Sequence, residues 1–217
     1  MATESMTDHA YEAIRQMLVR LELAPGELLN QEALQERIGV GRTPVHQALQ
    51  RLEAEEFVVV MPRRGVMVTN VDVLELPVLY ESRALLEPYM AGVAATRGTS
   101  DDWDEMERVL VLAGAVRTVE ERVSADRRCH EIIWAASGNR FLSRTLDMLY
   151  AQSDRLWHMY LIDVTDMQQS LAEHEQLLGV LRSGDADEAS AVMAQHIREL
   201  HDQINAVIAD SIGARAS

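Results

Sequence analysis

The sequence has few of the features that stabilise a secreted or membrane-bound protein. Its 217 residues include a single cysteine, Cys129, so no disulfide can form within the chain, which is typical of a reducing compartment. No stretch approaches the roughly 18 consecutive apolar residues of a membrane span. The first residues are acidic where a secretory leader would be basic. These features predict a cytoplasmic protein with no membrane partner.

Positive charge is also scarce, because the chain has no lysine and its 20 arginines face 35 acidic residues, a net charge of -15. Such a balance argues at first against nucleic acid, since DNA-binding proteins usually present a positive surface. The charge is uneven, however. Residues 1–70 hold 7 arginines against 10 acidic residues, whereas residues 71–217 hold 13 against 25. The excess of acid lies mainly in the C-terminal two-thirds, so the N-terminal part remains compatible with DNA binding.

The first 70 residues follow the pattern of a winged helix-turn-helix. Apolar residues recur at spacings of three and four between Thr7 and Leu23, which predicts an amphipathic helix ended by Pro25 and Gly26. A short helix over 31–38, a glycine-rich turn over 39–41 and a further helix from 42 come next. Two β-branched runs, 57–61 and 66–69, flank a turn and predict a hairpin. The second helix of such a pair enters the major groove of DNA.

From residue 71 onward the sequence shows only helical patterns. The predicted helices lie at about 72–97, 101–117, 119–136, 140–161, 166–182 and 186–211, and the breaks between most of them contain glycine followed by a capping residue. The predicted fold is mainly α, with a winged helix-turn-helix in residues 1–70, a linker in 71–75 and an antiparallel all-α helical bundle in 76–217.

Four side chains in the bundle have the spacing of a metal site. Asp126 and His130 are four residues apart and share one helix face. His174 lies ten residues before Gly184 and His196 twelve after it, so two antiparallel helices joined there bring both imidazoles to similar heights. Three histidines and a carboxylate suit a divalent ion, with zinc favoured and nickel, manganese or iron as alternatives. Each histidine could instead be a surface residue or a buried polar group of the core.

Several segments resemble a known family of bacterial regulators. Residues 25–29, 39–49 and 51–53, which include Gly41-Arg42-Thr43-Pro44, closely resemble the DNA-binding domain of GntR-type regulators. Residues 83–87, 126–130 and 136–139 resemble the FCD effector-binding domain of the FadR-type branch. The resemblance implies the same four metal ligands. Double-stranded operator DNA is the predicted partner, and a homodimer is expected because one short helix pair cannot supply useful specificity and two-fold symmetry doubles the contacts.

A metal with open coordination positions would attract a small carboxylate, and an arginine fork beside it would select one. Arg83 occupies the position where the resemblance implies a pocket arginine, and Asn139 and Arg155 are further candidates for effector binding. The alternative for Arg83 is a surface ion pair with Glu87, four residues later. A small organic acid is therefore the predicted effector.

The predicted DNA contacts come from the recognition helix and the hairpin tip. Arg42 is placed to reach a guanine edge, because the N-terminal residues of such helices meet the bases. The others are Gly41, Thr43, His46, Arg63, Arg64 and Gly65. Each arginine could instead be a solvated turn residue. Many relatives have Ser or Thr in place of Gly41, Arg in place of His46 and Glu in place of Gln47. The operator of this protein is therefore expected to differ from theirs.

The predicted function is a ligand-responsive transcriptional regulator, expected to be a repressor, and not an enzyme. Two alternatives remain. A metal-dependent hydrolase or oxygenase could use the same His/Asp site with Glu131, Glu173 or Glu175 as general base. A helical dimerisation module could hold the metal for structure alone. Neither alternative accounts for residues 25–69.

Overall fold

The computed structural model describes residues 5–115, 118–160 and 168–215. It divides into two compact units. The first contains Met1–Asp72 together with Asp154–Met159, and the second contains Val73–Ser153 and Tyr160–Ser217. The predicted limits of the domains and linker stay a prediction.

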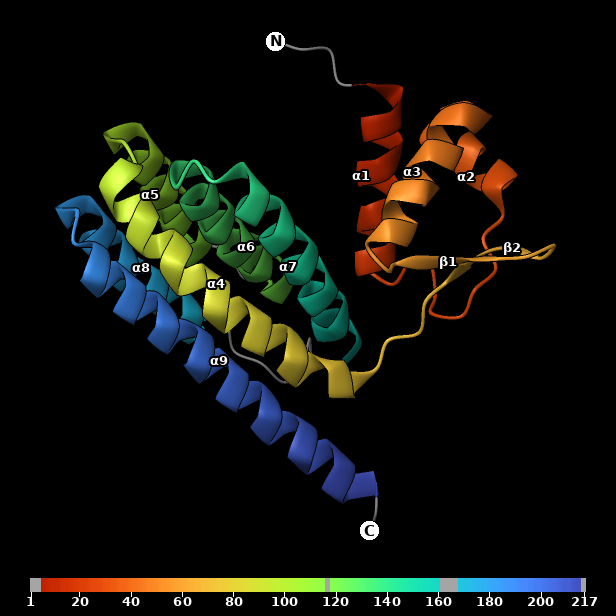
Figure 1. Cartoon of the computed structure of the whole chain (residues 1–217). Coiled ribbons are helices and arrows are strands. Elements are labelled where there is room, and N and C mark those ends of the chain that lie inside the picture. Colours follow the sequence, from red (N-terminus) through yellow and green to blue (C-terminus); the bar gives the residue numbers. More distant parts are fainter. Residues whose placement is uncertain (1–4, 116–117, 161–167, 216–217) are drawn as a thin grey trace. The chain divides into compact units, whose positions relative to one another are not determined.

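The first unit contains three helices and a two-stranded sheet (Figure 1). Its elements are α1 (Met6–Val19), α2 (Gln31–Ile38), α3 (Arg42–Ala54), β1 (Val58–Met61) and β2 (Gly65–Val68). Ile14, Leu18, Leu52 and Phe57 are completely buried and join α1, α3 and the start of the hairpin into one core. The predicted winged helix-turn-helix is therefore confirmed as the fold of this unit.

The end of α1 differs from the prediction. The helix stops at Val19, four residues before Leu23, because Leu21 adopts a left-handed conformation with φ of 59°. The amides of Glu22 and Leu23 then donate to the carbonyl of Met17 at 2.9 and 3.3 Å. These bonds close the helix end with a left-handed residue, a position that glycine usually occupies. The apolar spacing alone does not reveal this helix end.

The turn between α2 and α3 positions the recognition helix. The Asn30 side chain caps α2 by accepting from the amides of Glu32 and Ala33, and Gly39 ends it in a left-handed conformation with φ of 76°. α3 then begins directly after Gly41, which has no side chain that could cap the helix. Arg42 is consequently the first residue of α3.

The hairpin forms the wing. β1 and β2 are antiparallel, with Val58 opposite Val68 and Met61 opposite Gly65. The segment before α2 extends the sheet, because the amide of Leu29 donates to Val66 at 2.8 Å and the amide of Val68 donates to Glu27 at 2.9 Å. The exposed turn carries Arg63 and Arg64.

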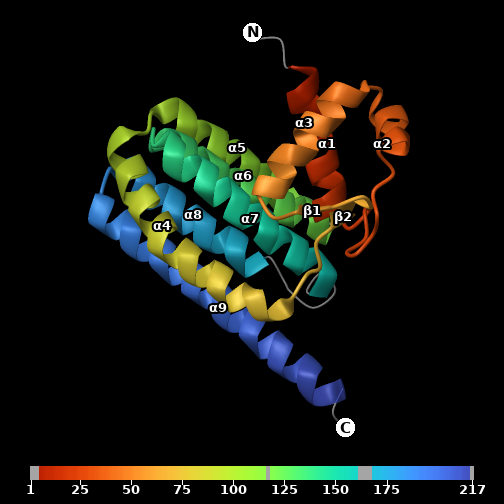
Figure 2. The same cartoon turned by 45° about the vertical axis from the view of Figure 1, so that its right-hand side comes forward.

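The second unit is helical throughout its described residues, as predicted. A short 3-10 helix, η1 (Val73–Glu75), precedes α4 (Leu76–Arg97), α5 (Ser100–Ala115), α6 (Val119–Ala136), α7 (Arg140–Tyr160, of which Asp154–Met159 belongs to the first unit), α8 (Gln168–Ser183) and α9 (Ala186–Arg215). The predicted ends at 117, 161 and 166 lie outside the described residues. Figures 1 and 2 both show α4 running alongside α9. No helix among the described residues is long and apolar enough to cross a bilayer.

Candidate functional site

Three helices of the bundle bring four ligand-type side chains to one point. Asp126 and His130 come from α6, His174 from α8 and His196 from α9. Each offers one ligand atom, and these atoms all lie within 4.8 Å of one another. None of the four residues is more than 2% exposed. The predicted set therefore converges in the core of the bundle.

The chain geometry explains this convergence. On α6, a spacing of four residues places Asp126 and His130 one turn apart. At the α8–α9 turn, Gly184 has a φ of 77°, which favours glycine, and the chain reverses there. His174 and His196 then meet edge to face, with ring centroids 4.5 Å apart. His196 Nε2 also lies 3.3 Å from His130 Nε2.

Each histidine contacts an acceptor through its Nδ1 atom. His174 Nδ1 lies 2.9 Å from the carbonyl of Ser170, and His196 Nδ1 lies 2.6 Å from Glu173 Oε2. His130 Nδ1 lies 2.5 Å from Glu87 Oε2, an ion-pair contact that lacks the alignment of a hydrogen bond. The hydrogen bonds of His174 and His196 favour the tautomers with Nδ1 protonated, which leaves Nε2 as the ligand atom.

Hydroxyl groups hold the carboxylate of the cluster. The Ser170 hydroxyl donates to Asp126 Oδ1 and the Tyr150 hydroxyl donates to Asp126 Oδ2. Burial opposes ionisation of Asp126, but its electrostatic coupling to His174, His130 and His196 and the hydrogen bond from Ser170 outweigh burial and hold its pKa well below the usual range. Asp126 is thus ready to act as an anionic ligand at neutral pH.

His174 is held in its neutral form. Burial, followed by the charge of the neighbouring His196, lowers the pKa of His174 to about 3. Its Nε2 atom is buried without a hydrogen-bond partner. A buried, unpartnered imidazole nitrogen is costly unless something binds it. The donor set of three imidazoles and one carboxylate fits a divalent transition metal.

Arg83 of α4 lies beside the cluster but does not form the surface pair that was its alternative. Its Nε donates to Glu87 Oε1 at 2.6 Å, and the side chains of both residues are at most 2% exposed. The guanidinium carbon also lies 4.3 Å from the centre of the Tyr150 ring. Arg83 Nη2 is buried without a hydrogen-bond partner. One donor of the fork therefore remains for a ligand.

The other two effector candidates have local structural contacts. Asn139 Oδ1 accepts from the amide of Leu142 at 3.3 Å, as a cap of α7. Arg155 lies in the first unit, where it donates to the hydroxyl and the carbonyl of Thr69 at 2.9 and 2.6 Å. The described contacts of these two side chains do not include the cluster, and their part in effector binding stays a prediction.

Sequence reasoning missed the residues that surround the ligands. The sequence indicates Glu87 only as a surface partner of Arg83 and Glu173 only as a general base, and it indicates no role for Ser170 or Tyr150. One signal was available for Ser170, which precedes His174 by one helical turn. A carbonyl at that spacing is within reach of the imidazole.

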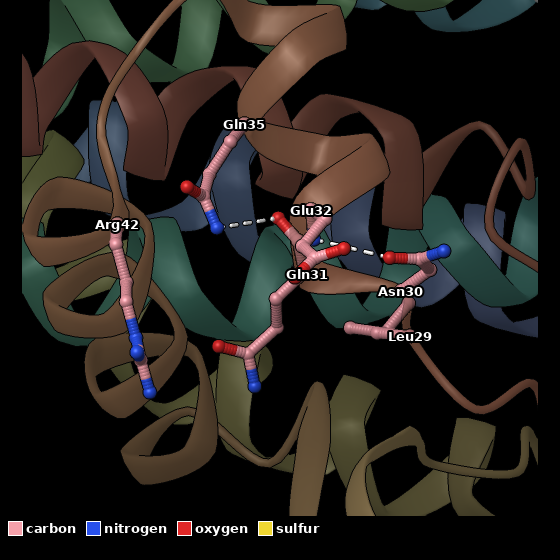
Figure 3. A pocket seen from close by; sticks show the side chains of 6 residues that line it. All are labelled: Leu29, Asn30, Gln31, Glu32, Gln35 and Arg42. Atoms are coloured by element: carbon pink, nitrogen blue, oxygen red, sulfur yellow. Dashed lines mark hydrogen bonds between the residues drawn. The ribbon is translucent and has the colours of Figure 1, made fainter.

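The predicted DNA-binding residues lie at the surface of the first unit. Gly41, Arg42, Thr43 and His46 are exposed at the start of α3. A hollow of about 420 Å³ lies next to Arg42, and Figure 3 shows the side chains that line it. The hollow is lined by Leu29, Asn30, Gln31, Glu32, Gln35 and Arg42. Arg63, Arg64 and Gly65 are exposed on the hairpin, with φ values of 65° at Arg63 and 109° at Gly65.

Two family models match the sequence. The model for bacterial regulatory proteins of the gntR family matches residues 6–68, and the model for the FCD domain matches residues 78–199, more than half of the chain. The second match includes all four cluster residues. Neither family consists of enzymes, which removes the support for a metal-dependent hydrolase or oxygenase.

Individual relatives agree with these matches. An uncharacterized HTH-type transcriptional regulator in an unstable DNA locus of Streptomyces ambofaciens is 28% identical over 214 residues, covering 93% of this chain and 86% of that protein. The HTH-type transcriptional repressor RspR of Escherichia coli K12 is 22% identical over 208 residues, covering 94% and 91%.

A solved structure, that of E. coli McbR/YncC, shares the fold with a TM-score of 0.81 at 22% identity, covering 94% of this chain and 98% of that one. The sequence matches, the winged helix-turn-helix and the helical bundle lead to one conclusion. The chain is a DNA-binding transcriptional regulator that belongs to the gntR family of bacterial regulatory proteins and carries an FCD domain.

Proposed function

We propose that this regulator responds to a small carboxylate bound beside a divalent metal in its FCD domain. The observation that carries the proposal is the buried cluster of Asp126, His130, His174 and His196, with His174 Nε2 left unpartnered. The four side chains would hold the ion, with zinc as the first candidate and nickel, manganese or iron as alternatives. The ion would supply Lewis acidity and, with a coordination number above four, open positions for an anionic ligand.

Arg83 supports the choice of a carboxylate as effector. It is positively charged in the core, because Glu87 holds its pKa above the usual range despite burial. Its unpartnered Nη2 offers a donor that an anion would satisfy. A ligand can shift a protein between two arrangements only if it binds one of them better, so the effector must prefer one arrangement of the bundle helices.

The winged helix-turn-helix would read a pseudo-palindromic operator as part of a homodimer. In this proposal Arg42 contacts a guanine edge, the amides of Gly41 and Thr43 bind phosphate, and Arg63 and Arg64 reach phosphate or the minor groove. His46 and Gly65 complete the predicted surface. Because the target is genomic DNA, a cytoplasmic location is part of the proposal, as is repression relieved by the effector.

An exposed apolar strip on α4 supports a homodimer. Val78, Leu85 and Tyr89 are separated by seven and four residues, which places them on one helix face, and all three are exposed. Exposed apolar side chains grouped in this way often mark protein interfaces. Two-fold symmetry would double the contacts to DNA. Light scattering of the purified protein would detect a dimer, and a monomer at micromolar concentration would contradict this part.

The central experiment is a gel-shift titration on the intergenic DNA that adjoins the coding sequence. It is repeated with a panel of small organic acids, with and without a chelator, and the metal content is measured by elemental analysis. We expect about one divalent ion per chain and an acid whose effect on DNA binding is lost with the chelator. A bound metal with no response to any acid would favour a purely structural ion, and a chain that takes up no metal would overturn the proposal.

A further inference from the structure

The ligands of the cluster are themselves held by a second layer of acidic side chains from other parts of the bundle. Glu87 comes from α4, a helix that contributes no ligand, and its Oε2 lies 2.5 Å from His130 Nδ1. Glu173 comes from α8, and its Oε2 lies 2.6 Å from Nδ1 of His196 on α9. Two of the three imidazoles therefore meet a carboxylate on the side away from the cluster.

We propose that Glu87 and Glu173 are positioning residues for the metal, an inference that rests on the proposed metal binding. A carboxylate that accepts the Nδ1 proton fixes the tautomer and the ring orientation of a histidine, and it raises the basicity of the opposite nitrogen. Glu173 thus orients His196 through a hydrogen bond, and Glu87 orients His130 through a close contact of 2.5 Å that lacks the alignment of a hydrogen bond. His174, whose Nδ1 contacts the carbonyl of Ser170, needs no acidic side chain for the same purpose.

The two glutamates differ in their surroundings. Glu87 is completely buried, and its other oxygen accepts from Arg83 Nε at 2.6 Å. The side chain of Glu173 is 19% exposed, and its Oε1 accepts from Gln169 Nε2 at 2.9 Å. Glu87 joins Arg83 to His130 in an unbroken line of contacts, whereas Glu173 joins His196 to the surface. Arg83, and any anion that it binds, would then be coupled to the ion through a single carboxylate.

The contacts also define the substitution that tests the role. Each glutamate oxygen faces an N–H donor. A glutamine at the same position must turn its NH₂ group, itself a donor, toward one of these two donors. Glu87→Gln and Glu173→Gln therefore disturb the orientation of His130 and His196 while they keep size and shape. Glu175→Gln is the matched control, because Glu175 lies on α8 next to His174 and its side chain is exposed.

The experiment measures Zn²⁺ affinity of the full chain by competition with a chromophoric chelator. Loss of such contacts typically weakens metal binding by about 10- to 100-fold. We expect losses of that size in Glu87→Gln and Glu173→Gln, and a change of less than about threefold in Glu175→Gln. The absorption bands of the Co²⁺-substituted protein should also change in the first two variants, which a purely structural role would not cause.

The possible failures are distinguishable. If the wild-type chain takes up no Zn²⁺ or Co²⁺, the proposed metal site itself is wrong. If the wild type binds metal and all three variants match it in affinity and Co²⁺ spectrum, the metal site stands and the positioning roles are wrong. Should Glu87→Gln fail to fold because Arg83 loses its partner, the partly exposed Glu173 still decides the result: wild-type affinity in Glu173→Gln would overturn the inference.

Discussion

In the winged-helix unit, the residues proposed to meet DNA lie at the surface, and Arg42, His46 and Arg63 are all exposed. In the bundle, the proposed ligands are at most 2% exposed, and most of their polar atoms meet other side chains. The difference predicts two kinds of response to substitution. Substitutions on the DNA-binding surface should change DNA affinity independently of one another. Substitutions in the cluster should change metal binding, the effector response and stability together.

The largest expected effect is the loss of metal in His174→Ala. The substitution removes one of three imidazoles from a buried site, so metal content should fall from about one ion per chain to near zero, and the response to organic acids should disappear with it. Specific DNA binding should remain. His201→Ala is the matched control, because His201 lies on α9 and stacks on Tyr80. Full metal occupancy in His174→Ala would show that the ligand set is wrong.

A smaller effect, confined to the other unit, is expected in Arg42→Ala. Loss of a bidentate contact to guanine costs about 1–3 kcal/mol in each half-site of the proposed dimer, which corresponds to roughly 5- to 150-fold in operator affinity per subunit. Metal content and the unfolding temperature should not change. Arg37→Ala serves as control, because Arg37 on α2 forms an exposed ion pair with Glu22. Unchanged affinity in Arg42→Ala, measured by fluorescence anisotropy, would refute the assignment of this contact.

The metal-free protein should lose stability in mild acid. The folded-state pKa of His174, about 3, lies below its ordinary value of 6.5, so the unfolded chain binds more protons between these values and stability falls as the pH falls. Moving from pH 7 to pH 5 should cost about 2 kcal/mol from this residue. The lowered pKa values of Asp126 and Glu87 add losses of the same sign at still lower pH.

Urea denaturation at the two pH values measures this effect. The difference should shrink in His174→Ala, which lacks the titrating group. A free energy of unfolding that is equal at pH 5 and pH 7 in the metal-free wild type would contradict the burial of a neutral His174.

The smallest expected effect concerns His46, which stands where many relatives have an arginine. His46→Arg adds one positive charge to the recognition helix. If that charge meets a phosphate, the slope of log affinity against log salt should steepen by about 1 for each subunit, or about 2 for the proposed dimer on its operator. His9→Arg, which adds the same charge at an exposed position of α1, is the control. Equal slopes in both variants would place position 46 away from the phosphates.

The sequence predicted most of the fold because the decisive signals were local. Asn30, Gly39 and Gly184 mark helix ends through their own capping and backbone preferences. The early end of α1 was missed because Leu21, with φ of 59°, is not a residue expected to reverse a helix. The residue type at position 21 does not predict a left-handed conformation.

The same distinction applies to the cluster. The i,i+4 spacing of Asp126 and His130, and the nearly equal distances of His174 and His196 from one turn, could be read from the chain. The acceptors on the Nδ1 atoms could not, because Glu87 precedes His130 by more than forty residues and meets it only through the packing of α4 against α6. Contacts of this kind depend on tertiary structure.

The line from Arg83 through Glu87 to His130 also has a consequence for signalling. These contacts join the cluster to α4, and α4 is the first long helix after the wing in the chain. Filling or emptying the core of the bundle would therefore pull on the helix that is covalently continuous with the DNA-reading half. In the proposed function, α4 would carry the effect of ligand binding toward the winged-helix unit along the chain itself.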